Sequence, residues 1–147
     1  MKQKILKISE NDQDHNFPYT PSEEEPYMNP RQVEYFRRKL LEWRNKVMED
    51  SFDTVSQLKN SIDRESDFLD QSSIEINNSL LLRNRDRDRK LIRKIDEALE
   101  RIRSGKYGFC EQTGRKIGLK RLEARPIATL CVKAQEWRER AERKYRH

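Results

Sequence analysis

No glycine and no proline interrupts residues 31–104 of this chain, and this absence constrains its fold more than any other feature. These two residue types end or break most helices, so the segment is expected to form long helices. Apolar residues recur in its first half at intervals of three and four, which is typical of one buried helix face. The first of them are Val33, Phe36, Leu40, Trp43 and Val47. The stripe then slips by one position and resumes at Phe52, Val55, Leu58 and Ile62.

Both ends of this segment carry helix-terminating signals. Asn29 is a good N-cap residue, Pro30 suits the first helical position, and Gln32 stands where a capping box places Glu or Gln. Gly105 follows the last apolar position and can adopt the left-handed conformation that ends many helices. The helical segment is therefore predicted to span residues 29–105.

A second apolar stripe indicates that the segment folds back on itself. The stripe consists of Ile74, Leu81, Ile92, Ile95, Leu99 and Ile102. Asp and Ser, which favour turns, concentrate before it near residues 64–72. Two helices of about 33 residues, each about 50 Å long, would then match in length. We expect a monomeric antiparallel coiled-coil hairpin, because the slip after Val47 and a polar gap at 83–90 do not fit the uniform heptads of a parallel coiled coil between chains.

The predicted fold is mainly α, with the long hairpin standing on a small globular base. Residues 1–28 are expected to form a mostly extended arm, which aromatic residues could attach to the base. These are Phe17, Tyr19 and Tyr27. Residues 106–147 are expected to form the base, with glycine-containing turns or a small hairpin and then a helix from Ala128 to the end. That helix would carry Leu130, Ala134, Trp137 and Ala141 on one face.

The composition agrees with an elongated molecule and excludes several function classes. Only 33% of the 147 residues are hydrophobic and 39% are charged, whereas a compact domain is about 45–50% apolar. The net charge is +6, but 32 basic residues alternate with 26 acidic ones, so solvated helix faces are favoured over a DNA-binding stripe. No signal peptide or membrane-spanning stretch is recognisable, which predicts a cytoplasmic protein. His15 and His147 stand in no catalytic pattern, so an enzyme is not expected.

Two polar segments are candidate functional sites. Asp67 and Asp70 flank Phe68 and Leu69 at the predicted tip. The acids could simply cap a turn, but two large apolar residues on an isolated tip also suggest a contact site. Residues 83–90 hold five cations within eight consecutive polar positions. They could form solvated i,i+4 pairs or dock on an acidic surface.

The cysteines resemble half of a zinc site. Cys110-x-x-Thr113 is followed after seventeen residues by Cys131-x-x-Ala134. A structural zinc site of this type needs a cysteine at both ends of each pair. Two thiols without a nearby histidine cannot complete a closed tetrahedral site, so no bound metal is expected.

Several motifs together resemble the DksA/TraR family of RNA polymerase-binding transcription factors. The similarity covers roughly residues 27–140. It rests on Tyr27-Met28-Asn29, Phe36-Arg37-Arg38, Trp43-Arg44, Arg83-Asn84-Arg85-Asp86-Arg87, Ile117-Gly118, Arg121-Leu122-Glu123-Ala124-Arg125-Pro126 and Leu130-Cys131.

The resemblance implies a function at bacterial RNA polymerase without direct DNA or membrane binding. Members of the family insert the hairpin into the secondary channel and destabilise open complexes at sensitive promoters, such as those of ribosomal RNA. The family's acidic tip pattern corresponds to Asp67, Asp70 and Ser72 here. Its contacts with the polymerase rim correspond to Arg87 and Lys90.

The resemblance also implies ppGpp as a co-effector that binds between the factor and the polymerase. The family residues for this nucleotide correspond to Leu91, Lys94 and Arg125, whereas Gln135 replaces a lysine. Loss of this cation predicts a reduced but not absent response to ppGpp. The altered positions Thr113 and Ala134 are similar to those of zinc-free members, in which apolar packing would replace the metal.

Two other functions remain open at this point. A Gre-like transcript-cleavage factor shares a hairpin with an acidic tip, and two acids three residues apart could help hold Mg²⁺. The base motifs favour the DksA/TraR family over this alternative. The second alternative is a coiled-coil adaptor without any effect on transcription.

Overall fold

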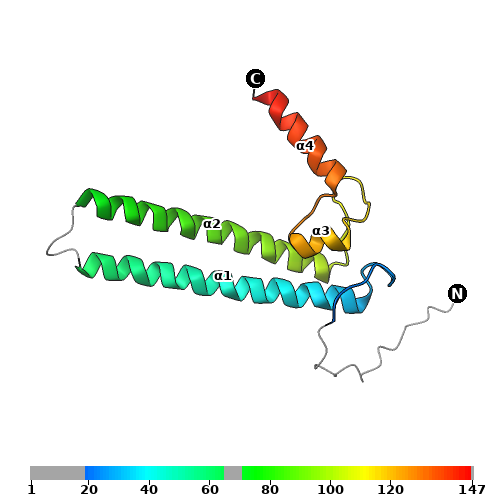
Figure 1. Cartoon of the computed structure of the whole chain (residues 1–147), viewed down its shortest axis with the longest axis horizontal. Helices are drawn as coiled ribbons and strands as arrows, with labels where there is room; N and C mark the ends of the chain where they lie inside the picture. Colours follow the sequence, from blue (N-terminus) through cyan, green and yellow to red (C-terminus); the bar gives the residue numbers. More distant parts are fainter. Residues whose placement is uncertain (1–18, 65–70, 147) are drawn as a thin grey trace.

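The computed structural model describes residues 19–64 and 71–146, with side chains over 19–60 and 73–146. Its helices are α1 (Pro30–Arg64), α2 (Gln71–Arg103), α3 (Leu119–Ala124) and α4 (Val132–Tyr145). Helices α1 and α2 lie side by side as a long hairpin, and α3 and α4 gather at the end where α1 begins (Figure 1). The mainly helical hairpin on a small base is confirmed. No helix in the described part of the chain is long and apolar enough to cross a membrane.

The predicted signals at both ends of the hairpin are present. The Asn29 side-chain oxygen accepts hydrogen bonds from the backbone N–H groups of Arg31 (3.0 Å) and Gln32 (3.1 Å). The Gln32 amide oxygen accepts a bond from the Met28 N–H (2.9 Å), one residue earlier than a standard capping box. At the other end Gly105 has φ 77°, and the N–H groups of Gly105 and Lys106 donate back into the last turn of α2.

The seam between α1 and α2 is fully buried near the base and only half-buried further along, where polar positions alternate with apolar ones such as Val55 and Leu58. Phe36, Leu40 and Ile95 are fully buried between the two helices. Beyond Val47 the half-buried seam position is Ser51, while Phe52 is 71% exposed. The predicted slip of the stripe is therefore wrong: the helix keeps its phase, and the polar Ser51 replaces an apolar residue on the seam.

The base packs its own apolar side chains against the start of the hairpin. The buried residues are Tyr107, Ile117, Leu119, Leu122, Ala128 and Leu130, in one cluster with Phe36, Leu40 and Ile95. An isolated antiparallel bridge joins Phe109 and Lys116, so the expected small turn structure is present. This continuity places the base at a fixed position beside the first turns of α1 and the last turns of α2.

The C-terminal helix begins later than predicted. Its first residue is Val132 and not Ala128, because two preceding carbonyl groups are already engaged by the base. The Glu111 N–H donates to Thr129 (2.9 Å) and the Arg121 Nε donates to Leu130 (2.9 Å). The predicted apolar face is also wrong beyond its first turn. Ala134 is buried, whereas Trp137 is 77% exposed because α4 projects away from the hairpin (Figure 1).

The described part of the expected arm, residues 19–28, forms turns that attach to the hairpin and the base. The Tyr27 hydroxyl donates to the Gly108 carbonyl (2.6 Å) and accepts from the Gly118 N–H (3.0 Å). Tyr19 lies edge-on to Tyr35 of α1, with ring centroids 6.1 Å apart. Phe17 lies outside the described residues.

Candidate functional site

The predicted acidic tip lies mostly outside the described residues. Asp67 and Asp70 fall in the segment 65–70, and the side chain of Ser72 is likewise not described. The flanking helix ends can be placed, however. Arg64 ends α1 and Gln71 begins α2, both at the end of the hairpin far from α3 and α4 (Figure 1).

Only two residues of the basic stretch 83–90 lie on the seam between α1 and α2, so the stretch interrupts the apolar seam at two positions. Only Arg85 and Asp88 are half-buried, at the positions that continue the heptad of Ile92 and Ile95. The remaining six residues are exposed, including the predicted contact residues Arg87 and Lys90. These two cations are therefore available to a partner on the outer surface of α2.

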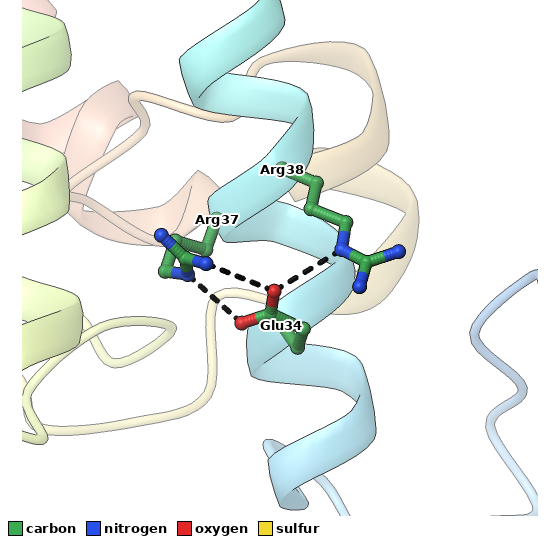
Figure 2. A network of polar contacts seen from close by, with 3 residues as sticks. All are labelled: Glu34, Arg37 and Arg38. Carbon is green, nitrogen blue, oxygen red and sulfur yellow. Dashed lines mark hydrogen bonds and ion pairs between the residues drawn. The ribbon is translucent and has the colours of Figure 1, made fainter. Parts of the chain in front are cut away.

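Another charged cluster on the hairpin satisfies its charges internally. The Glu34 carboxylate accepts hydrogen bonds from Arg37 (2.8 and 3.0 Å) and from Arg38 (3.1 Å), as Figure 2 shows. The Arg37 hydrogen bond is the main cause that lowers the pKa of Glu34. Such i,i+3 and i,i+4 pairs at the surface stabilise a helix by only about 0.2–0.5 kcal/mol each. Because the Glu34 carboxylate is already paired with two arginines, this cluster is an ordinary solvated helix face and not a candidate binding site.

A pocket of about 280 Å³ lies where the end of α2, the end of α3, the following loop and α4 meet. It brings together three of the four residues predicted to surround ppGpp, namely Lys94, Arg125 and Gln135. The fourth, Leu91, does not line the pocket and packs against the core. The pocket also contains three charged residues that the sequence analysis did not select. They are Glu97, Arg121 and Arg138.

The pocket is strongly positive, because four cations face one carboxylate. Within residues 19–64 and 71–146, no ion pair or hydrogen bond engages the side chain of Lys94 or Arg125. Arg121 is half-buried and held by its bond to the Leu130 carbonyl. Unpaired cations around a concave surface suit a ligand that carries several phosphates. The spacing of Arg138, three residues after Gln135 on a helix, was the available sequence signal for its place in this pocket.

The four remnant zinc positions come together in the base, but their chemistry does not fit a zinc ion. Cys110, Cys131 and Ala134 are buried, and both cysteines are free thiols. The Thr113 hydroxyl lies 3.7 Å from the Cys131 sulfur and accepts a bond from the Arg115 N–H. A methyl group and a hydroxyl that is already bonded replace two thiolates. Among the described residues no group of three His, Cys, Asp or Glu could hold a metal.

The backbone around Cys110 still favours a thiolate. Burial opposes ionisation of this thiol, but the Thr113 hydroxyl and the N–H groups of Cys131, Thr113 and Gln112 outweigh it and lower its pKa to about 6. A zinc-binding turn directs N–H groups at its sulfur in the same manner. The turn thus keeps the electrostatic character of a metal site without the complete donor set.

The chain matches two family models that together cover most of its length. Residues 32–102 match the N-terminal domain of the DnaK suppressor protein DksA, and residues 105–140 match the prokaryotic DksA/TraR C4-type zinc finger. The RNA polymerase-binding transcription factor DksA of Caulobacter vibrioides is 54% identical over 128 residues, which cover 87% of this chain and 90% of that protein. The chain belongs to the DksA/TraR family.

Two further relatives support the family assignment. The RNA polymerase-binding transcription factor DksA of Escherichia coli K12 is 43% identical over 115 residues, covering 78% of this chain and 76% of that protein. The solved structure of transcription factor DksA2 from Pseudomonas aeruginosa has a TM-score of 0.75 and 43% identity, covering 80% of this chain and 90% of that one. Against the family's C4-type zinc finger, this chain has two cysteines.

Proposed function

We propose that this protein is a cytoplasmic, monomeric transcription regulator that binds bacterial RNA polymerase with its hairpin. The observation that carries the proposal is the long, narrow α1–α2 pair in a chain that matches the DksA/TraR family over both its hairpin and its base. A helix of 33 residues, the length of α2, extends about 50 Å. Such a hairpin is long and thin enough to enter the secondary channel and carry its tip toward the active site of the enzyme.

In this proposal the tip acids act on the polymerase and not on a substrate of their own. Asp67, Asp70 and Ser72 would lie near the polymerase active site and destabilise open complexes at sensitive promoters, such as those of ribosomal RNA. Arg87 and Lys90, both exposed on α2, would hold the hairpin at the channel rim. The protein itself would have no catalytic activity and no direct contact with DNA.

The positive pocket of the base would hold part of ppGpp at the boundary with the polymerase. Lys94 and Arg125 carry unpaired charges into it and can each bind a phosphate group. Leu91 packs against the core without lining the pocket, so it would support the pocket indirectly. Gln135 lines the same pocket with a neutral amide, so residue 135 taken alone predicts a weakened response to ppGpp.

The base would act without zinc. Its buried apolar cluster and the hydrogen bonds of Tyr27 and Tyr107 join the segments that a metal would otherwise hold together. Elemental analysis tests this directly, and one stoichiometric zinc per chain would contradict it.

The experiment that tests the function is transcription from a ribosomal RNA promoter with purified polymerase, with and without ppGpp. Wild-type protein is expected to inhibit it, and Asp67→Asn and Asp70→Asn are expected to lose most of this inhibition. Asp53→Asn is the matched control, because it makes the same charge change at an exposed position of the same hairpin. If all three variants inhibited like the wild type, the tip acids would have no part in the inhibition. If the wild type itself did not change transcription, the protein would be an adaptor without effect on transcription.

A transcript-cleavage assay on stalled elongation complexes separates the proposal from the Gre-like alternative. The proposed regulator should not stimulate cleavage of the nascent RNA. Cleavage that depends on Asp67 or Asp70 would replace the proposal with that alternative, since the acids would then help the polymerase hold a metal ion.

A further inference from the structure

The pocket of the base contains a cation that is one helical turn away from the neutral Gln135. Both Gln135 and Arg138 of α4 line this pocket, together with Lys94 and Arg125. Residues at i and i+3 lie on the same helix face, with their Cβ atoms about 5–6 Å apart. An arginine side chain spans that distance. The side chain of residue 138 can therefore reach the volume that a longer cationic side chain at position 135 would occupy.

The contacts of these two side chains show which of them can bind an anion. The Gln135 amide nitrogen already donates to Glu139 (3.0 Å), along the surface of α4. Among the side chains that the structure describes, Arg138 contacts only Glu142, through its Nε at 3.3 Å, and both partners of this pair are more than half exposed. An exposed pair of this kind contributes little. The two terminal nitrogens of the Arg138 guanidinium remain available for the paired hydrogen bonds that arginine makes with phosphate.

We propose that Arg138 is a phosphate-binding residue of the ppGpp pocket and supplies the positive charge that Gln135 lacks. This inference rests on the proposed function of the pocket. It also changes the expected response of the protein. The pocket retains four cations, with one of them moved by a single turn of α4. The neutral Gln135 alone predicts a weakened affinity for ppGpp, and the charge of Arg138 offsets this loss.

The test measures ppGpp binding to the complex of full-length protein and RNA polymerase, using radiolabelled ppGpp and subtracting binding to polymerase alone. Arg138→Ala should raise the Kd about tenfold, which is about 1.4 kcal/mol. Arg140→Ala is the matched control, because it removes the same charge from an exposed position of α4 that does not line the pocket. Its Kd should stay within about twofold of the wild type.

A double variant tests the exchange of positions. Gln135→Lys in the Arg138→Ala background should restore most of the lost affinity, because it returns a cation to the same pocket. Gln135→Lys alone should change the Kd much less than it does in that background. Equal gains in both backgrounds would show that the two positions act independently, and would overturn the exchange.

Lys94→Ala separates failure of this inference from failure of the pocket itself. If Lys94→Ala weakens binding while Arg138→Ala does not, Arg138 has no such role and the pocket stands. If the wild type shows no binding that depends on the factor, both the inference and the ppGpp part of the proposed function are wrong. Equal losses for Arg138→Ala and Arg140→Ala would reduce the effect to the overall charge of α4 and overturn the inference.

Discussion

The Tyr27 hydroxyl is expected to be a principal support of the base, and Tyr27→Phe removes it while keeping the ring. The hydroxyl bridges two parts of the base, since it donates to Gly108 and accepts from Gly118. The ring stays packed edge-on against Phe109, with centroids 5.5 Å apart. The substitution therefore tests two hydrogen bonds and almost no apolar contact.

The magnitude follows from what each former partner retains. A typical hydrogen bond contributes about 1 kcal/mol net, and a buried group left without a partner costs about 1–3 kcal/mol. The Gly108 carbonyl keeps a second bond from the Ile117 N–H (2.9 Å). The Gly118 N–H loses its partner, but Gly118 is only half-buried and water can reach it. The free energy of unfolding should thus fall by about 2 kcal/mol, which lowers Tm by about 4–8 °C in a chain of this size.

The measurement is urea unfolding followed by circular dichroism, with thermal unfolding as a second readout. Tyr145→Phe is the matched control, because Tyr145 is 92% exposed and its loss should change stability by less than about 0.5 kcal/mol. An unchanged slope of the unfolding free energy against urea concentration would show that both variants unfold from the same compact state. A loss below about 0.5 kcal/mol for Tyr27→Phe would refute the assignment of the hydroxyl as a support of the base.

Three further predictions concern the same base. If the base acts without zinc, as proposed, incubation with EDTA should leave Tm within ~1 °C; a large decrease would show that a structural metal contributes to folding. The Cys110 thiol, with its pKa lowered to about 6 from 9.0, should be ionised in the folded protein and protonated in the unfolded chain at pH 7.5. The stability that this ionised thiol contributes is then fully present above pH 9 and is lost as the pH falls through 6. Urea unfolding at several pH values should therefore show that the free energy of unfolding rises more steeply with pH for the wild type than for Cys110→Ser. If the free energies of the two proteins changed in parallel with pH, the shift in pKa would be contradicted. Gly108→Ala should destabilise the protein more than Gly114→Ala. Both glycines have positive φ, but only a Cβ at position 108 would approach Met28, at 2.7 Å from its Cγ. Equal decreases of Tm for the two variants would argue against that contact.

The helices and their boundaries could be predicted because their causes are local. The Asn29 cap and the Gly105 terminus are formed by side-chain and backbone groups within a few residues of each other. The apolar period likewise identifies the buried face near the base, where Phe36, Leu40 and Ile95 are fully buried. The local pattern failed at Phe52, because an apolar residue beside the seam looks like a shift of phase until the partner helix is placed.

The start of α4 could not be predicted for the opposite reason. The apolar period of Leu130, Ala134 and Trp137 extends the predicted helix back to Ala128. The carbonyl groups of Thr129 and Leu130 are instead engaged by Glu111 and Arg121. These donors come from other parts of the base, so no pattern within the C-terminal segment reports them. The exposure of Trp137 has the same origin, since it depends on the direction in which α4 leaves the base.

The sequence by itself determined the hairpin, its family and the loss of two zinc-binding cysteines, because helix periodicity, capping residues and motif spacing are all properties of order along the chain. Only the tertiary structure decided which charges share a pocket. Lys94, Arg125 and Arg138 come from the end of α2, the end of α3 and the middle of α4, and they meet where those elements pack around the buried base. Electrostatic attraction for a phosphate depends on distance in space, and packing brings these three cations close to one another although the chain separates them.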